Sequence, residues 1–408
     1  MKALQFDFHP LRYGATLLLG RLSRAAYWGP LSCLRYRDVP EPPLPGDDWV
    51  RVRTWYAGIC GSDLNLILLR ESPSLSPYSS FPFTLGHENV GVVEETGPAV
   101  SDLRVGQRVV VDPPLTCAPR GFTEPCPACA RGDPHCHRYH EGRLAPGIQI
   151  GACRDTGGSW SPCFVAHRSQ VFPVPDGVSD EDAVLAEPFA CALHAVSLAP
   201  PAPGDRVLVV GGGVIGLCTV AALRALGYPC RIVALVRHSF QAEAARVLGA
   251  DTVVQARGSR RYRAVADALG ARLLKPVLGP PVLAGGAPVV FECVGTGPAV
   301  DDALRFAAPG GRVVLVGLSA FPRGVDWTPI WFKELHVRGS FVTGSVDLPS
   351  GRRVRSLPLA LELMRAGKAR LGELVTHKFA LEEYRTALAT LLNRRHTGVI
   401  KAVFDFTR

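Results

Sequence analysis

The chain has 408 residues, of which 47% are hydrophobic and 20% charged. This composition is typical of globular proteins and excludes a disordered or collagen-like chain. At about 150 residues per domain, the length predicts two or three domains with substantial cores. Lys and Arg outnumber Asp and Glu by 45 to 36, a net charge of +9. This basic excess fits a phosphate-bearing ligand or a nucleic acid and does not distinguish between them.

Neither a membrane span nor a secretion signal is expected. The longest apolar stretch near the start, residues 15–19, is far shorter than the roughly 20 residues of a transmembrane helix. The opening residues MKALQFDFHP contain an acidic residue and no small-residue cleavage site. Twelve cysteines are too few for a disulfide framework in so long a chain. We therefore expect a cytoplasmic protein without a membrane partner, in which clustered cysteines bind a metal.

The pattern of apolar residues changes along the chain and predicts an α/β protein. From residue 1 to about 189, short alternating or apolar runs separated by Gly and Pro predict antiparallel β-structure. From about 190 to 341, apolar strands alternate with helical stretches, which predicts a parallel sheet with crossover helices. The final residues, 342–408, contain two amphipathic helix candidates and a closing strand.

Two segments are interpreted as insertions, residues 11–30 and 256–287. The first could line a cleft or an interface. The second contains six basic residues and one acidic residue, namely Arg257, Arg260, Arg261, Arg263, Arg272 and Lys275 against Asp267. Most such runs are solvated surfaces. The sequence shows no recognition helix, aromatic stacking platform or nucleic-acid motif, so we expect no nucleic-acid partner.

The segment DRVLVVGGGVIGLCTVAALRALG predicts a dinucleotide site. Gly211, Gly213 and Gly216 form a G-x-G-x-x-G frame between a predicted strand and a predicted helix. Gly211 permits the tight turn, Gly213 lets the backbone approach a pyrophosphate, and Gly216 allows close packing of helix on strand. The start of the helix, with Val214 and Ile215, supplies N–H groups and a positive dipole end to the phosphates.

The next predicted strand, RIVALV, indicates which dinucleotide is bound. An acidic residue after this strand would hold the ribose 2′-hydroxyl of NAD, but none is present. Arg237, His238 and Ser239 follow instead, and a cation with a hydroxyl suits a 2′-phosphate. The sequence thus predicts NADP over NAD. Alternatively, Arg237 is an ordinary exposed arginine and either cofactor is used.

Two motifs on separate loops, GICGSDLN and TLGHENVG, predict a first metal site. They contain Cys60, His87 and Glu88. Thiolate, imidazole and carboxylate suit Zn²⁺, and an incomplete protein shell leaves a position for substrate or water. Taken singly, Cys60 would more often be a small buried residue and His87 a hydrogen-bonded loop residue.

A second metal site is predicted in CAPRGFTEPCPACARGDPHC. The spacing C-x8-C-x2-C-x6-C joins four cysteines, Cys117, Cys126, Cys129 and Cys136. Such a cluster, with its C-x-x-C pair, predicts a closed tetrahedral zinc site that stabilises a lobe. The alternatives are redox activity of the C-x-x-C pair and ligation by His135 or His137.

Together these motifs resemble the zinc-dependent medium-chain alcohol dehydrogenase family, especially its polyol and threonine dehydrogenase branch. The resemblance extends over nearly the whole chain and is carried by GICGSD, GHENVGVVEETG, VGQRVVVDP, the cysteine lobe, LAEPFACALHAV, GGGVIG, ECVG and APGGRVVLVGL. It implies a GroES-like catalytic domain over 1–189, completed by 342–408, and a Rossmann cofactor domain over 190–341, with the active site in a cleft between them. It also implies a homodimer or homotetramer.

The resemblance assigns roles at the catalytic metal. Cys60 and His87 would bind zinc, with Glu88 on or beside the metal. Glu187 would be a further ligand or would hold a water molecule. Asp63 would orient His87 through its other ring nitrogen.

The resemblance also assigns residues to proton transfer and to cofactor binding. Ser62 would receive the substrate proton, and Val294 and Gly317, in the last two motifs, would join the cofactor site. Two positions depart from the family. Asn65 stands where a histidine often ends the proton relay, and Cys117 lies further from the next cysteine than the usual C-x-x-C.

The predicted activity is reversible hydride transfer between NADP(H) and a secondary alcohol or polyol, or the matching ketone. Zinc would act as a Lewis acid on the substrate oxygen. A zinc-independent quinone or enone reductase of the same superfamily would lack Cys60, His87 and Glu88. A non-catalytic dinucleotide- or nucleic-acid-binding protein is the third hypothesis.

Overall fold

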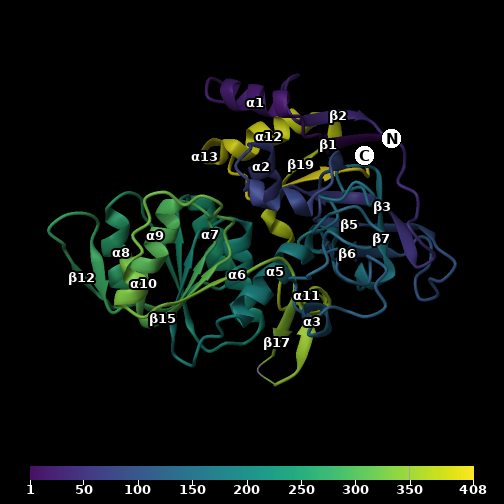
Figure 1. Cartoon of the computed structure of the whole chain (residues 1–408). Helices are drawn as coiled ribbons and strands as arrows, with labels where there is room; N and C mark the ends of the chain where they lie inside the picture. The colour runs from purple at the N-terminus through teal and green to yellow at the C-terminus, as the bar shows by residue number, and fades with distance from the viewer. Residues whose placement is uncertain (349) are drawn as a thin grey trace. The chain divides into compact units, whose positions relative to one another are not determined.

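The computed structural model describes residues 1–348 and 350–408, which form two compact units (Figure 1). The first unit combines Met1–Glu187 with Leu371–Arg408, and the second is Pro188–Arg370. Among the described residues, no helix is both long enough and apolar enough to cross a membrane.

The first unit is built on a seven-stranded sheet. Its order is β19-β20-β3-β5-β6-β8, and β7 pairs with β3. The strands are β3 (Trp49–Gly58), β5 (Asn89–Thr96), β6 (Arg108–Val111), β7 (Cys163–His167), β8 (Val171–Pro173), β19 (Val375–Phe379) and β20 (Lys401–Asp405). Alternating residues such as Val50 and Val52 point into a core completed by Trp49 and Phe164. All these strands except the parallel pair β19 and β20 run antiparallel, as the alternating texture predicts.

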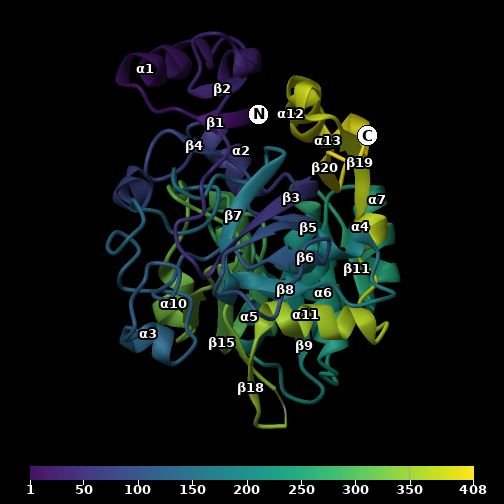
Figure 2. The same cartoon turned by 90° about the vertical axis from the view of Figure 1, so that its right-hand side faces the viewer.

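The first insertion extends a small sheet of this unit. The sheet has the order β2-β1-β4, with β1 (Lys2–Phe6), β2 (Leu34–Asp38) and β4 (Phe83–Thr84). Between β1 and β2 the chain forms α1 (Pro10–Leu19) and the 3-10 helix η1 (Arg24–Trp28). Figure 2 shows α1 beside β1 and β2, at one end of the unit. Thr16 is buried and donates a hydrogen bond to the Leu31 carbonyl, which anchors α1.

The second unit contains a six-stranded parallel sheet in the part of the chain that the structure describes. Its strands are β9 (Arg206–Val210), β10 (Arg231–Val236), β11 (Thr252–Gln255), β14 (Ala287–Glu292), β15 (Ala307–Leu315) and β16 (His336–Gly339). Their spatial order is β11-β10-β9-β14-β15-β16, so the third strand in sequence lies at one edge and the first lies in the middle. This is the doubly wound order of a dinucleotide-binding fold. The predicted α/β fold class is confirmed.

Helices flank this parallel sheet on both sides (Figure 1). They are α6 (Val214–Ala225), α7 (Ser239–Val247), α8 (Arg260–Leu269) and α9 (Gly297–Phe306). The strands are apolar almost throughout, and β9 is buried from Val207 to Val210. Strands covered on both faces have no polar side to alternate with, which explains their continuous apolar runs.

The second insertion contributes to the core as well as to the surface. It forms α8 and a hairpin of β12 (Arg272–Leu274) and β13 (Val282–Ala284). Tyr262 and Val265 of α8 pack in the core, and Arg261 forms an ion pair with Asp302 at 2.6 Å. The other basic residues of the segment are exposed, in line with a solvated surface.

The unit boundaries differ from those expected. The family resemblance places residues 342–408 with the first unit, whereas residues 342–370 belong to the second compact unit. This segment contains β17 (Ser345–Asp347), β18 (Arg353–Arg355) and α11 (Ser356–Arg365). His194 of the second unit lies with its Nδ1 3.0 Å from the Ser345 carbonyl oxygen. An amphipathic pattern shows that a helix has an apolar face but not which unit covers it, so the sequence pattern by itself does not assign this segment.

Candidate metal centres and cofactor site

The turn that follows β3 presents Cys60. Cys60 is the N-cap of α2 (Gly61–Ile67), and its backbone N–H donates to Asp63 Oδ2 at 2.9 Å. The other oxygen of the same carboxylate, Oδ1, lies 3.5 Å from His87 Nδ1. Asp63 therefore contacts both loops that carry predicted ligands, and it orients His87 with Nε2 pointing elsewhere.

Cys60, His87 and Glu88 come together in space. Each offers a ligand atom, and these atoms all lie within 4.8 Å of one another. His87 and Glu88 are buried, whereas Cys60 is half-buried. Ser62 Oγ lies 3.4 Å from His87 Nε2, beside the same group. A thiolate, an imidazole and a carboxylate at this spacing fit Zn²⁺ with one position left for another ligand.

Sequence reasoning missed the partner of Glu88, which is Lys401 on β20. Lys401 Nζ forms an ion pair with Glu88 Oε2, and each side chain is only 2% exposed. Nζ also donates to the Ile59 carbonyl at 3.2 Å. Burial alone would lower the pKa of Lys401, but the charges of Glu88 and Cys60 outweigh it and hold this pKa above its usual value. A lysine inside the apolar run GVIKAVF is the signal that could have revealed it.

The same electrostatics act on His87. Burial disfavours its charged form, but the negative charges of Asp63 and Cys60 raise its pKa well above the usual value. A histidine binds a metal only through a neutral nitrogen, so loading this site must release a proton. The arrangement therefore stabilises positive charge at this position.

Glu187 stands apart from the three-residue group. In the part of the chain that the structure describes, no candidate metal cluster includes it. It lies in α5 (Ala186–Ser197) and is buried, and its negative charge also raises the pKa of Lys401. Glu187 therefore stays a prediction, as a further ligand or as a residue that holds a water molecule.

The position expected to end a proton relay is occupied by Asn65, on α2. Its carbonyl accepts a hydrogen bond from the Arg70 N–H at 2.8 Å, and its amide side chain is no base. Another carboxyl lies nearby in Glu71. Burial, with a smaller contribution from the charge of Asp63, raises the pKa of Glu71 to about 7.

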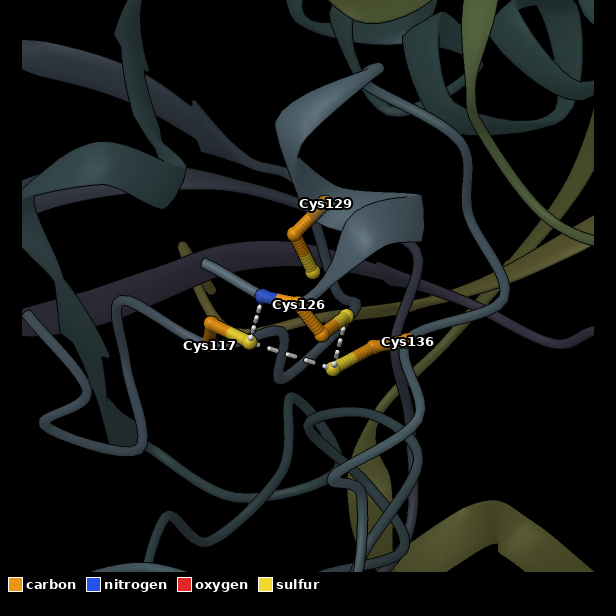
Figure 3. Close-up of side chains that lie close together, drawn as sticks. All are labelled: Cys117, Cys126, Cys129 and Cys136. Carbon is orange, nitrogen blue, oxygen red and sulfur yellow. Dashed lines mark hydrogen bonds between the residues drawn. The ribbon is translucent and has the colours of Figure 1, made fainter. Parts of the chain in front are cut away.

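The four cysteines of the second motif converge on one point (Figure 3). Their sulfur atoms lie within 4.8 Å of one another, and Cys117 Sγ is 3.7 Å from Cys136 Sγ. The Cys126 N–H donates to Cys117 Sγ at 3.3 Å. A hydrogen bond from Cys136 is the main cause that lowers the pKa of Cys129 to about 5. The unusual spacing thus does not displace Cys117, and the set fits a closed tetrahedral zinc site.

The glycine-rich turn connects β9 with α6 in the second unit. Gly211 has φ +117°, and a Cβ added to it would lie 2.7 Å from Val294 Cγ2. A Cβ on Gly216 would lie 2.0 Å from the Gly211 carbonyl oxygen. Gly213 is the N-cap of α6. A side chain at Gly216 would thus collide within the turn, and one at Gly211 would collide with the neighbouring ECVG loop, so both positions require glycine.

A buried carboxylate that the sequence reasoning did not single out shapes the neighbouring ECVG loop. Glu292 ends β14, and its Oε1 accepts hydrogen bonds from the N–H groups of Val294 and Gly295, at 2.8 and 3.0 Å. A Cβ on Gly317 would lie 2.2 Å from the Gly295 nitrogen. Val294 and Gly317 therefore lie in two loops that pack against each other beside the glycine-rich turn. A glutamate at the end of an apolar strand was the available signal.

The residues predicted to select the dinucleotide form the turn between β10 and α7. Gln241 Oε1 accepts hydrogen bonds from the N–H groups of Arg237 and His238, each at 3.3 Å. The His238 ring stacks on Phe240 with centroids 5.2 Å apart. Arg237 and Ser239, the first residue of α7, are exposed. The turn is thus held by its own neighbours and presents its cation to solvent.

Comparison with known proteins finds one matching family model for the N-terminal part of the chain and one for the dinucleotide-binding part. Residues 46–176 match the family model for the alcohol dehydrogenase GroES-like domain, and residues 214–354 match the model for zinc-binding dehydrogenases. L-idonate 5-dehydrogenase of Vitis vinifera is 30% identical over 386 residues, 95% of each chain. Sorbitol dehydrogenase of Arabidopsis thaliana is 30% identical over 368 residues, 89% of this chain and 90% of that one.

Solved structures show the same fold over at least 91% of this chain. The alcohol dehydrogenase of Aeropyrum pernix is 26% identical, with a TM-score of 0.73, and the match covers 99% of this chain and 100% of that one. A putative zinc-binding dehydrogenase from Sinorhizobium meliloti 1021, bound to NADP, is 29% identical with a TM-score of 0.67, covering 91% and 95%.

The fold and the two candidate metal centres define a zinc-binding, dinucleotide-dependent oxidoreductase. The chain belongs to the zinc-dependent medium-chain alcohol dehydrogenase family. It is an alcohol or polyol dehydrogenase that uses NAD or NADP and acts on a small molecule. The predicted family is thereby confirmed, and neither the zinc-independent reductase nor the non-catalytic protein is favoured.

Proposed function

We propose that this chain catalyses the reversible oxidation of a secondary alcohol, in particular of a polyol, to the ketone, with hydride transfer to NADP. The observation that carries the proposal is the convergence of Cys60, His87 and Glu88, which brings a zinc-type donor set together in the β-rich unit. The curated relatives named for idonate and sorbitol support a polyhydroxylated substrate.

Each residue at this site has a different proposed role. Cys60 and His87 would hold zinc, which when bound supplies Lewis acidity towards the substrate oxygen. Asp63 fixes both ligand loops through its two oxygens. Ser62 lies beside His87 and is the hydroxyl placed to accept the substrate proton. Glu187 is proposed as a nearby acid that holds water rather than as a direct ligand.

The preference for NADP is supported by the turn after β10. Arg237 is exposed there, and no carboxylate occupies the three positions that follow the strand. Arginine pairs with phosphate through two parallel hydrogen bonds, which a ribose hydroxyl cannot reciprocate. The relative from Sinorhizobium meliloti was solved with NADP, which is in keeping with this choice.

The assembly is proposed to be a homodimer or homotetramer built on the second unit. Phe321, Trp331 and Phe332 are each at least 67% exposed, and the last two end α10 (Thr328–Phe332), which precedes the edge strand β16. Exposed aromatic residues beside an open sheet edge favour an interface. The cytoplasm is the proposed location because thiolate ligands such as those of the cysteine lobe require a reducing compartment.

A paired activity and metal assay tests the proposal. Alcohols and ketones are screened with NADP(H) and with NAD(H), following the absorbance of the reduced nicotinamide. We expect polyol turnover with a higher kcat/KM for NADP, and Cys60→Ala should abolish turnover while keeping the zinc of the cysteine lobe. Full activity of Cys60→Ala, or a clear preference for NAD, would contradict the mechanism or the cofactor choice respectively.

A further inference from the structure

Two chain segments emerge side by side at the carboxyl edge of the parallel sheet. Strands β10 and β11 are neighbours, and their last residues, Val236 and Gln255, are paired in the ladder. The residues that follow each strand therefore leave the sheet at the same place. Arg237 follows β10, and Arg257 comes two residues after β11, at the start of the second insertion.

The Arg257 side chain forms hydrogen bonds to the turn after β10. Its Nε and Nη2 donate to the Arg237 carbonyl oxygen at 3.2 and 3.1 Å. Nη2 also lies 3.2 Å from His238 Nδ1. Both arginine side chains are nevertheless exposed to solvent. These contacts leave Nη1 of Arg257 with its own hydrogens to donate.

Among residues 1–348 and 350–408, no ion pair joins a carboxylate to Arg237 or Arg257. Glu243 on α7 forms an ion pair with Arg246, at 3.4 Å. Asp251 forms an ion pair with Arg224, at 2.5 Å. The nearest acidic residues along both segments are thus engaged with other arginines. The Arg257 guanidinium held on this turn, beside the exposed Arg237, favours an anion with several oxygens, and a phosphate monoester is such an anion.

We propose that Arg257 is a second cationic ligand of the 2′-phosphate of NADP and that it determines cofactor specificity together with Arg237. The inference rests on the proposed function and extends it, because it gives the second insertion a role in recognition. The bonds of Arg257 to the Arg237 carbonyl hold the turn, while its remaining donors and its charge are available to the phosphate. A lysine at this position would keep the charge and lose the fork of donors.

A binding experiment separates charge recognition from support of the turn. The zinc-loaded protein is titrated calorimetrically with 2′,5′-ADP and with 5′-ADP, which lacks the 2′-phosphate. A charge-assisted hydrogen bond corresponds to a change in affinity of about 10-fold or more. We expect Arg257→Ala to weaken binding of 2′,5′-ADP by at least about 10-fold and to leave 5′-ADP unchanged. The affinity of Arg257→Lys for 2′,5′-ADP should lie between that of the unmodified protein and that of Arg257→Ala.

A matched variant and two outcomes keep the test decisive. Arg263→Ala removes an exposed arginine on α8 of the same insertion and should change neither affinity. Equal weakening of both ligands by Arg257→Ala would show that Arg257 only supports the turn, and would overturn the proposal. So would an unchanged affinity for 2′,5′-ADP in Arg257→Ala when Arg237→Ala loses it.

Failure of the proposed function is recognised in the unmodified protein. If it binds 2′,5′-ADP no more tightly than 5′-ADP, the preference for NADP is wrong irrespective of Arg257, and the role of Arg257 falls with it. If it does discriminate, the cofactor choice stands and only the variants decide about Arg257.

Discussion

Lys401 and Glu88 form a buried ion pair between the last strand of the chain and the loop that carries a predicted metal ligand. The two residues are 313 positions apart in the sequence, and each side chain is 2% exposed. Neither charge could be buried at this depth without the other, because an unpaired ion in a low-dielectric interior carries a large desolvation penalty. The pair therefore connects the C-terminal segment to the metal centre.

Removal of Lys401 should destabilise the first unit strongly. In Lys401→Met the Glu88 carboxylate stays buried without its partner, which typically costs about 3 to 5 kcal/mol of the free energy of unfolding. Urea unfolding followed by circular dichroism measures this loss. The double variant Glu88→Gln with Lys401→Met leaves no unpaired charge and should recover a large part of it.

An exposed ion pair provides the control for this experiment. Lys2 and Asp38 lie 2.6 Å apart with side chains 52% and 74% exposed. Lys2→Met should change stability little, because water screens such pairs. A loss in Lys401→Met no larger than that in Lys2→Met would show that the buried pair does not stabilise the unit.

Cys117 should be needed for the zinc of the cysteine lobe despite its unusual spacing. In Cys117→Ser the cluster loses one of four converging sulfur atoms, and a closed site with three thiolates binds zinc less tightly. Elemental analysis should show about one zinc per chain fewer than in the unmodified protein. Cys163→Ala is the control, because burial raises the pKa of Cys163 to about 11 and keeps it a neutral thiol. Unchanged zinc in Cys117→Ser would identify another fourth ligand.

Asp63→Asn tests the residue that joins the two ligand loops. The amide has one acceptor oxygen, so it cannot serve both the Cys60 N–H and His87 Nδ1, and its neutral group no longer faces the histidine. Loss of such an orienting partner usually lowers metal affinity by about 10- to 100-fold. Chelator competition measures it, and the zinc of the cysteine lobe is the internal reference. Equal loss from both sites would indicate general unfolding instead.

Glu71 should make stability fall between mildly acidic and neutral pH. Its pKa is about 7 in the folded protein, above the ordinary value of 4.5, so the folded state favours the protonated form. The contribution of Glu71 to stability is present below pH 4.5 and is lost as the pH rises through about 7. We therefore expect Glu71→Gln to be more stable than the unmodified protein by about 2 kcal/mol at pH 8 and equal to it near pH 4.5.

The pH series has a simple comparison in Glu124→Gln, which changes an exposed glutamate of the same unit. Urea unfolding at several pH values should give parallel curves for this variant and the unmodified protein. A stability gain for Glu71→Gln that does not depend on pH would refute the titration of Glu71 as its cause.

Gly216→Ala should disrupt the cofactor turn without unfolding the second unit. The new Cβ would lie 2.0 Å from the Gly211 carbonyl oxygen, so the helix start must move away from the strand. We expect 5′-ADP binding to fall by at least about 10-fold, because the N–H groups of the turn no longer point at the phosphates. Gly339→Ala, where a Cβ has nothing within 4 Å, should bind normally.

The features of this protein that the sequence could predict are those formed by residues close together in the chain. Gly211, Gly213 and Gly216 lie in one short strand-turn-helix unit, and Cys126, Cys129 and Cys136 lie in one short segment, so sequence spacing alone restricts where they can go. The spacing of apolar residues likewise predicted antiparallel β-structure in the first part of the chain. It predicted a parallel sheet with crossover helices in the second part, and the structure has such a sheet there. Glu292 shows the limit of this reasoning. Its hydrogen-bond partners, the N–H groups of Val294 and Gly295, are close in sequence, yet its role became visible only when the structure showed the carboxylate buried and bonded to them.

Long-range pairing was decided by the tertiary structure. Whether Cys117 could reach the other sulfur atoms depended on how the loop between Cys117 and Cys126 folds back. The assignment of residues 342–370 depended on which unit covers their apolar face, and the partner of Glu88 depended on the register of β20. The sequence by itself determined the local motifs, because neighbouring residues have few ways to be arranged. Only the folded chain decided which distant charges and surfaces meet, because contact between them depends on how the whole chain packs.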